Sequence, residues 1–253
     1  MRRKLVAALA CRNQGSRLYG KPLQNLDVKN GIRIIDNIID GLKSLDCIDS
    51  IVLGISEGVD NDVFKLIAKQ KGIEFIIGDQ VDVLQRLIMC TKKVNGTDIF
   101  RVTSESPFLY YKEVNKIWEQ HLLQKNDATF YMDIIDGCGF EFITLQALVK
   151  SHLKGEKKHR SEMCTLYIKE NLNDFKVQNI KVPKHLNRND IRLTVDNPED
   201  LVVCRKIYNE FKNQAPQISL EDIIIYLDRN TELKKIIYPY TIEAHLKTSN
   251  KND

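Results

Sequence analysis

The first hundred residues alternate between short apolar runs and longer amphipathic stretches. Four apolar runs have the length of buried strands, at residues 5–10, 51–55, 73–77 and 98–103. Three stretches between them predict helices, at residues 34–45, 62–71 and 81–94. Strands that alternate with helices in this way predict a parallel sheet covered by helices on both faces. Such sheets bind ligands beyond the carboxyl ends of their strands.

The alternation loosens beyond residue 125. Three segments there predict extended structure, at residues 128–134, 140–144 and 175–182, and two predict helices, at 145–153 and 162–171. The segment IRLTVDNPEDLVVCRKIYNEF, residues 191–211, predicts a strand, an acidic turn and a helix. Pro198 would open that helix, with Asp196 or Asn197 as its cap. We therefore expect a single domain over residues 1–253, with a small α+β lobe inserted at about residues 127–185.

The composition is that of an ordinary globular protein, with 253 residues, 43% hydrophobic and 28% charged. The formal net charge of +4 would attract anionic small molecules. The basic residues form no stripe interleaved with aromatic residues, so we expect no nucleic-acid partner. No segment approaches the ~18 consecutive apolar residues of a membrane span, so we expect no membrane insertion.

The six cysteines are scattered along the chain and form no C-x-x-C pair. This pattern favours reduced thiols in a cytoplasmic protein over a zinc site or a disulfide framework. The basic residues at positions 2–4 precede a short apolar run that continues directly into Arg12. We interpret that run as a first strand and not as an export signal.

A basic turn, ACRNQGSRLYGKPL at residues 10–23, follows this first strand. Its backbone N–H groups can point inward, and Gly15 and Gly20 would let a ligand approach closely. Arg12, Arg17 and Lys21 add positive charge to the same turn. A chain of phosphates suits such a site, because it carries dense negative charge and many acceptor oxygens. The alternative is a solvated basic loop at the edge of the sheet.

The basic turn resembles the A-R-x-x-S-x-R-L-x-G-K-x-L signature of sugar cytidylyltransferases, a family that includes CMP-Kdo and CMP-sialic acid synthetases and the SpsF-type enzymes. Four more family motifs follow in order, in GDQVDVLQRL (78–87), IFRVTSESPFL (99–109), DGCGFEFIT (136–144) and RLTVDNPEDL (192–201). The resemblance spans roughly residues 5–210. It implies a three-layer, Rossmann-like (GT-A-like) α/β nucleotidyltransferase fold with a mostly parallel sheet.

The resemblance also implies a reaction. An acceptor oxygen attacks the α-phosphorus of CTP and expels pyrophosphate, which requires positioning and charge neutralisation more than covalent catalysis. The catalytic residues implied are Arg12, Lys21, Glu105 and Asp196. The nucleotide-binding residues implied are Ala10, Arg12, Gly15, Ser16, Arg17, Lys21, Arg86 and Thr103. For Arg86, the alternative is an exposed arginine on a helix.

Magnesium is the implied cofactor, held by Glu105 and Asp196 beside the phosphates. Glu105 stands where the family has aspartate, and its extra methylene would move the carboxylate by about one bond length. Asp196 could instead serve only as a helix cap. Glu105 could instead be an exposed loop residue.

The implied acceptor residues are Arg101, Glu141, Arg160 and Glu162. Met163 stands where the family often has histidine, which indicates an altered acceptor. The basic run KGEKKHR, residues 154–160, would meet an anionic acceptor, or alternatively form a solvated loop. An acidic sugar would give a CMP-sugar, and a phosphorylated acceptor would give a CDP-linked product.

By the same resemblance, the 127–185 lobe would cover the acceptor pocket and support a homodimer. The product would serve bacterial surface polysaccharide or capsule synthesis. Two alternatives remain open at this point: a nucleotidyltransferase that uses another nucleoside triphosphate, and a nucleotide-binding module that has lost catalysis.

Overall fold

The computed structural model describes residues 2–249 and is built around a seven-stranded sheet in the order β5-β4-β1-β6-β8-β7-β9. Its strands are β1 (Leu5–Cys11), β4 (Ser50–Ser56), β5 (Glu74–Gly78), β6 (Asp98–Arg101), β7 (Ala128–Tyr131), β8 (Phe140–Thr144) and β9 (Val177–Asn179). All neighbouring strands pair in parallel except β8, which is antiparallel to both β6 and β7. The sheet is therefore mostly parallel, as the sequence predicts.

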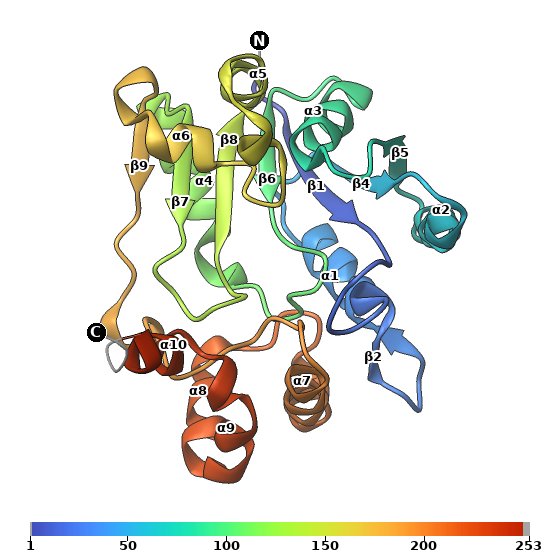
Figure 1. The fold of residues 1–253 in the computed structure, drawn as a ribbon, viewed down its shortest axis with the longest axis vertical. Helices are drawn as coiled ribbons and strands as arrows, with labels where there is room; N and C mark the ends of the chain where they lie inside the picture. The colour runs from blue at the N-terminus through green and yellow to red at the C-terminus, as the bar shows by residue number, and fades with distance from the viewer. Residues whose placement is uncertain (1, 250–253) are drawn as a thin grey trace.

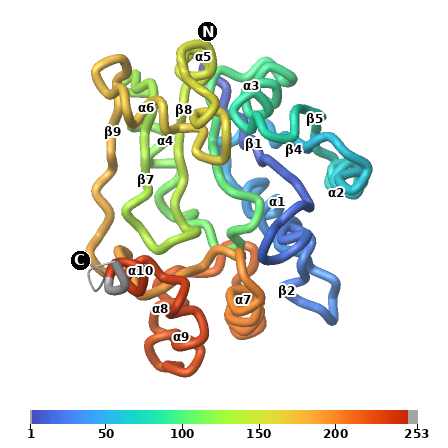
Figure 2. Tube along the Cα trace, viewed as in Figure 1, coloured from blue at the N-terminus to red at the C-terminus, as the bar shows by residue number. Residues whose placement is uncertain are grey.

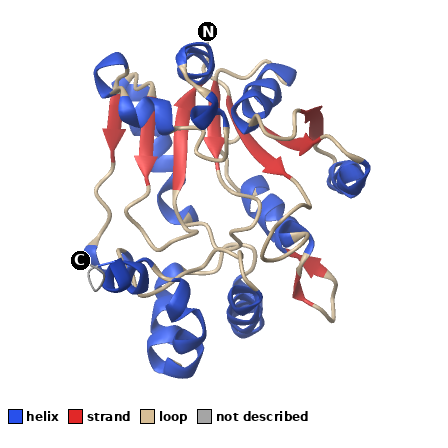
Figure 3. Cartoon of the chain, viewed as in Figure 1, coloured by secondary structure: helices blue, strands red, loops and turns tan. Residues whose placement is uncertain are grey.

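Helices cover both faces of this sheet (Figures 1 and 3). They are α1 (Ile34–Lys43), α2 (Asp62–Lys71), α3 (Val83–Lys93), α4 (Val114–Gln124), α5 (Leu145–Lys154), α6 (Leu166–Glu170), α7 (Pro198–Phe211), α8 (Leu220–Arg229), α9 (Thr231–Ile237) and α10 (Ile242–Ser249). Among residues 2–249, no helix has both the length and the apolar composition that crossing a bilayer requires.

Strand β1 shows why the chain forms three layers. Its side chains alternate between two separate apolar cores, with Leu5 and Leu9 in one and Val6 and Ala8 in the other. A strand buried on both faces needs a continuous apolar sequence, which residues 5–10 provide. The three-layer α/β fold predicted from the alternating pattern is confirmed.

The 127–185 segment contributes strands β7, β8 and β9 to the same sheet, and α5 and α6 belong to it as well. Cys164 and Ile168 join Val6 of β1 in one core. This segment is thus continuous with the main sheet in its packing. Its roles in acceptor binding and dimer formation stay predictions.

The predicted strand at residues 191–195 is wrong. The segment makes a single β-bridge, between Arg192 and Asp136, and otherwise runs as a buried loop. Its alternating apolar residues Ile191, Leu193 and Val195 are buried in the large core. Alternation here reflects burial of one side of a loop, because its backbone bonds to other loops instead of to a strand.

The C-terminal helices α7 to α10 gather beyond one end of the sheet (Figure 2). Helix α7 packs against β2 (Asn25–Asp27), which pairs with β3 (Ile32–Arg33) in a small separate hairpin. Arg205 of α7 donates a hydrogen bond to the backbone oxygen of Asn25 at 2.7 Å. The acidic turn before α7 is thereby held close to the N-terminal part of the chain.

Candidate active site

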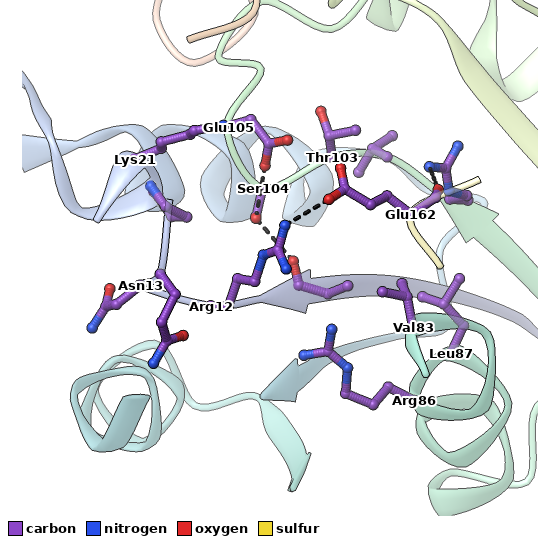
Figure 4. A pocket seen from close by; sticks show the side chains of 15 residues that line it. Arg12, Asn13, Lys21, Val83, Arg86, Leu87, Thr103, Ser104, Glu105 and Glu162 are labelled. Carbon is purple, nitrogen blue, oxygen red and sulfur yellow. Dashed lines mark hydrogen bonds and ion pairs between the residues drawn. The ribbon is translucent and has the colours of Figure 1, made fainter. Parts of the chain in front are cut away.

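A cleft opens at the carboxyl ends of β1 and β6, the position in which parallel sheets bind ligands. It encloses about 740 Å³ of empty space, its open mouth included. The residues that line it are Ala10, Arg12, Asn13, Gln14, Lys21, Pro22, Val83, Arg86, Leu87, Arg101, Val102, Thr103, Ser104, Glu105 and Glu162. Figure 4 shows these side chains converging from β1, α3 and the loop after β6.

The basic turn folds back on itself after β1. The amide of Gly20 donates to the carbonyl of Asn13 at 2.8 Å, and the amide of Asn13 donates to Asn61 Oδ1 at 2.8 Å. Gly15 permits this closure, since a Cβ at its position would lie 2.4 Å from the carbonyl oxygen of Leu18. The turn therefore returns Lys21 to the cleft, at the start of the short helix Lys21–Leu23.

Lys21 meets Asp196 across the cleft edge. Lys21 Nζ lies 2.5 Å from Asp196 Oδ1, and Arg17 lies 3.5 Å from the same oxygen. Burial alone would raise the pKa of Asp196, but the hydrogen bond from Lys21 and the charges of Lys21, Arg192 and Arg17 hold it below its ordinary value. Two motifs that are 175 residues apart are thus joined in one site.

Asp196 is not the residue that caps α7. The cap is Asn197, and the carboxylate of Asp200 accepts the backbone N–H groups of Asp196 and Asn197 at 3.0 and 2.8 Å. The Asp196 carboxylate is therefore free of a capping role and faces the basic turn.

Glu105 lies beside this pair. The amide of Val195 donates to the Glu105 carbonyl at 3.0 Å, which ties the loop after β6 to the Asp196 turn. The Glu105 carboxylate accepts a hydrogen bond from Ser104 at 3.2 Å. Within residues 2–249, no basic side-chain nitrogen lies within 4.0 Å of it. Burial raises the pKa of Glu105; the Lys21 charge opposes this rise and the Asp196 charge adds to it. Glu105 lines the cleft instead of standing exposed on a loop.

These two carboxylates fit a magnesium ion that also binds phosphates. Mg²⁺ is usually held by one or two carboxylates together with substrate phosphates and water. No cluster of three or more metal-ligating side chains occurs in the part of the chain that the structure describes. A metal here would therefore depend on a bound nucleotide for its remaining ligands.

Arg86 is buried at the floor of the cleft, and the alternative of an exposed helical arginine is wrong, because only 1% of it is exposed. Its Nη1 donates to the carbonyls of Cys11 and Gly54, each at 3.3 Å, while its Nε has no hydrogen-bond partner. Burial lowers the pKa of Arg86. The buried guanidinium therefore ties α3 to the ends of β1 and β4, and the Arg86 side chain also lines the cleft.

The predicted acceptor residues are mostly bonded to one another. Arg101 donates to Glu141 at 2.9 Å and to the backbone carbonyl of Glu162 at 3.0 Å. Glu141 is 1% exposed and also accepts from Thr165 at 3.1 Å and Lys169 at 3.3 Å. Burial alone would raise the pKa of Glu141, but the charges of Arg101 and Lys169 hold it below its ordinary value.

Glu162 and Arg160 occupy different places. Glu162 reaches over the cleft and pairs with Arg12 at 2.6 Å (Figure 4). Arg160 ends the short helix Lys157–Arg160, donates to the carbonyl of His152 at 3.3 Å, and does not line the cleft.

Of the predicted nucleotide residues, Ala10 and Thr103 line the cleft, whereas Gly15, Ser16 and Arg17 do not. Sequence reasoning missed Asn13, Ser104 and Arg192. Arg192 was visible in the RLTVD motif, and it bonds to Asp196 in the structure.

A three-layer α/β fold with a cation-lined cleft at the carboxyl ends of its strands places the chain among the Rossmann-like α/β proteins that bind ligands at this edge. Within that class, the profile of the Cytidylyltransferase family matches residues 7–237. The chain therefore belongs to the cytidylyltransferase family.

Individual proteins are similar to this chain over most of its length. The uncharacterized protein MJ1063 of Methanocaldococcus jannaschii is 29% identical over 236 residues, 92% of this chain and 94% of that protein. The spore coat polysaccharide biosynthesis protein SpsF of Bacillus subtilis is 23% identical over 233 residues, 90% of this chain and 95% of that protein. A cytidylyltransferase from Leptospira borgpetersenii superposes with a TM-score of 0.82 at 22% identity, covering 92% of this chain and 97% of that chain, which shows the shared fold.

Proposed function

We propose that the protein is a magnesium-dependent cytidylyltransferase that transfers CMP from CTP to an anionic small-molecule acceptor and releases pyrophosphate. The contact between Lys21 and Asp196 is the observation that carries the proposal. This contact places the basic turn and the Asp196 carboxylate together at the edge of the cleft. A nucleoside triphosphate with its metal requires both, because the cations bind the phosphates and the carboxylate can bind the metal.

The triphosphate would replace the protein's own carboxylate as the partner of the basic turn. Arg17 and Lys21 now share the single charge of Asp196 with Arg192, whereas a triphosphate carries several charges and many acceptor oxygens. When these two side chains turn to the phosphates, the Oδ1 atom of Asp196 becomes available to magnesium. Glu105 would complete the protein's share of the metal ligands, and the bound ion would neutralise charge on the phosphates.

Arg86 would recognise the base. Val83 and Leu87 provide apolar walls beside it, and all three side chains line the same cleft. Cytosine presents a carbonyl oxygen and a ring nitrogen next to each other, and the planar donor fork of arginine suits such adjacent acceptors. Guanine also presents two adjacent acceptors, so the choice of CTP rests on the cytidylyltransferase family to which the chain belongs.

The acceptor would enter from the side of Arg101 and Glu162. The cleft carries the cations Arg12, Lys21, Arg86 and Arg101 against the carboxylates Glu105 and Glu162. This excess of positive charge favours an acidic sugar or a phosphorylated metabolite. SpsF of Bacillus subtilis is a spore coat polysaccharide biosynthesis protein, so we propose that the product is a building block of surface polysaccharide. We further propose a cytoplasmic homodimer as the working form.

A triphosphate panel tests the nucleotide. A ligand at ~100 times its dissociation constant stabilises the fold by ~2.7 kcal/mol, so CTP with MgCl₂ should raise the melting temperature more than ATP, GTP or UTP does. Pyrophosphate release is then measured with CTP and a set of acidic, phosphorylated and neutral sugars. We expect release with an anionic acceptor only. Equal shifts for all four triphosphates would contradict the CTP assignment, and CTP binding without release for any acceptor would indicate a module without catalysis.

A further inference from the structure

Arg192 lies behind Asp196 and contacts three aspartates at once. Its Nη1 donates to Asp136 Oδ2 at 2.6 Å, its Nη2 donates to Asp196 Oδ2, and its Nε lies 3.4 Å from Asp200 Oδ1. The side chain is 12% exposed, so it belongs to the interior of the site and not to the surface. No role has been assigned to it so far.

The two oxygens of Asp196 are divided between two sets of cations. Oδ2 is bonded to Arg192, on the side of the protein interior. Oδ1 is bonded to Lys21 and lies near Arg17, both of which belong to the basic turn at the cleft. Oδ2 of Asp196 is therefore occupied by its bond to Arg192, and only Oδ1 faces the place proposed for the phosphates.

Arg192 is itself held on both sides. The amide of Leu193 donates to the backbone carbonyl of Asp136 at 2.8 Å, beside the ion pair between Arg192 and Asp136. Gly137, with φ at +93°, allows the two segments to meet, because a Cβ there would lie 2.6 Å from the amide nitrogen of Thr194. The loop after β7 thus fixes the backbone of Arg192, and Asp200 at the start of α7 lies against its Nε.

We propose that Arg192 is a positioning residue that orients Asp196 so that Oδ1 alone faces the metal and the triphosphate. The inference rests on the proposed function. Asp136 and Asp200 hold two edges of the Arg192 guanidinium, so its remaining donor meets Asp196 Oδ2 from a fixed direction. The planar donor fork of arginine makes this possible, and a lysine ammonium cannot reproduce it. Partners that orient a metal-binding carboxylate in this way typically change metal affinity or activity by about 10–100-fold when they are removed.

The competing explanation is structural, since Arg192 also neutralises Asp136 and Asp200. The chain offers a matched control in Arg188, which likewise bridges two aspartates, Asp190 and Asp228, at 2.7 Å each. Those aspartates also pair with Lys234, and none of the four residues lines the cleft. Arg192→Lys and Arg188→Lys therefore both disturb an arginine held by aspartates, but only the first touches Asp196.

The test is calorimetric titration of the full chain with CTP over a series of MgCl₂ concentrations, without acceptor, together with melting temperatures. For Arg192→Lys, we expect the MgCl₂ concentration that half-saturates CTP binding to rise about 10-fold or more. Arg188→Lys should leave it unchanged, whatever the two substitutions do to the melting temperature. An unchanged magnesium dependence in folded Arg192→Lys, or an equal rise in Arg188→Lys, would overturn the inference.

A second variant covers the case in which Arg192→Lys fails to fold. Asp136→Asn removes the charge that anchors Arg192 but leaves the bond between Arg192 and Asp196 in place. It should raise the half-saturating MgCl₂ concentration in the same direction by a smaller factor, and no rise would count against the positioning role. A wild-type protein that binds no CTP at any MgCl₂ concentration would overturn the proposed function and this inference with it, whereas wild-type binding with unaltered variants would overturn the inference alone.

Discussion

The two ends of the cleft use the same kinds of residue in different ways. At the nucleotide end, Arg17 and Lys21 share one partly exposed carboxylate, that of Asp196. At the acceptor end, Glu141 is almost completely buried, and two cations and a hydroxyl surround it. An ion pair that a ligand can exchange serves binding, whereas one that is buried and saturated holds the protein together. Burial therefore separates the two roles where residue type and the number of charged partners do not, because Asp196 also bonds to Arg192.

The largest effect should come from removing the buried Glu141 carboxylate at the acceptor end. Glu141→Ala leaves Arg101 and Lys169 without their shared partner, so the free energy of unfolding should fall by about 3–5 kcal/mol in urea denaturation. Glu170→Ala is the control, because Glu170 also pairs with two basic side chains but is 40% exposed. A loss for Glu141→Ala no greater than that for Glu170→Ala would erase the contrast between the two ends.

The nucleotide end should respond more in activity than in stability. Asp196→Asn keeps the shape of the side chain but removes the charge that would bind magnesium. We expect kcat/KM for pyrophosphate release to fall roughly 10²–10³-fold, the loss typical of one electrostatic contact to the transition state. Asp228→Asn, in the separate ion network near α8, is the control. Wild-type activity in Asp196→Asn would rule out the metal assignment.

The contribution of the buried Glu141 carboxylate to stability should be lost at acidic pH. The pKa of Glu141 in the fold lies below its ordinary value of 4.5, so its contribution to stability is complete above that value and is lost as the pH falls through the folded-state pKa. Glu141→Gln cannot titrate, and its unfolding free energy should therefore depend less steeply on pH below 4.5 than that of the wild type. Parallel pH dependences would indicate that Glu141 is not held ionised by Arg101 and Lys169.

The smallest effect should come from the pair that joins the two ends. Arg12 and Glu162 are 43% and 74% exposed, and exposed ion pairs contribute only about 0–1 kcal/mol. Glu162→Ala should leave stability within that range and tighten CTP binding, because Arg12 no longer has a competing partner. Glu232→Ala, which breaks the exposed pair with Lys235, should change neither quantity. Weaker CTP binding in Glu162→Ala would mean that Glu162 assists the nucleotide instead of competing with it.

The sequence predicted the repeating part of the fold well, because buried parallel strands and their covering helices have distinct periodicities. It misplaced a strand at 191–195, where apolar alternation comes from a loop with one buried side. It also left out α4, α9, α10 and α8, although Leu220, Ile223, Ile224 and Leu227 of α8 recur at helical spacing. The family motifs end before that helix, so no resemblance directed attention to it.

The site was predicted unevenly for a physical reason. Lys21 and Asp196 belong to two motifs of one family, and the structure places them in contact. The role proposed for Arg192 depends on Asp136, 56 residues away, and on how two loops pack around Gly137. Such a contact has no signature in either segment alone, and it emerges only when the folded chain brings both together.

The most direct test of the central claim is a crystal structure of the protein with CTP and MgCl₂. We expect the triphosphate to lie against Arg17 and Lys21, with a metal ion bound to Asp196 and the base beside Arg86. A nucleotide bound in another part of the molecule, or a triphosphate turned away from Lys21, would contradict the account.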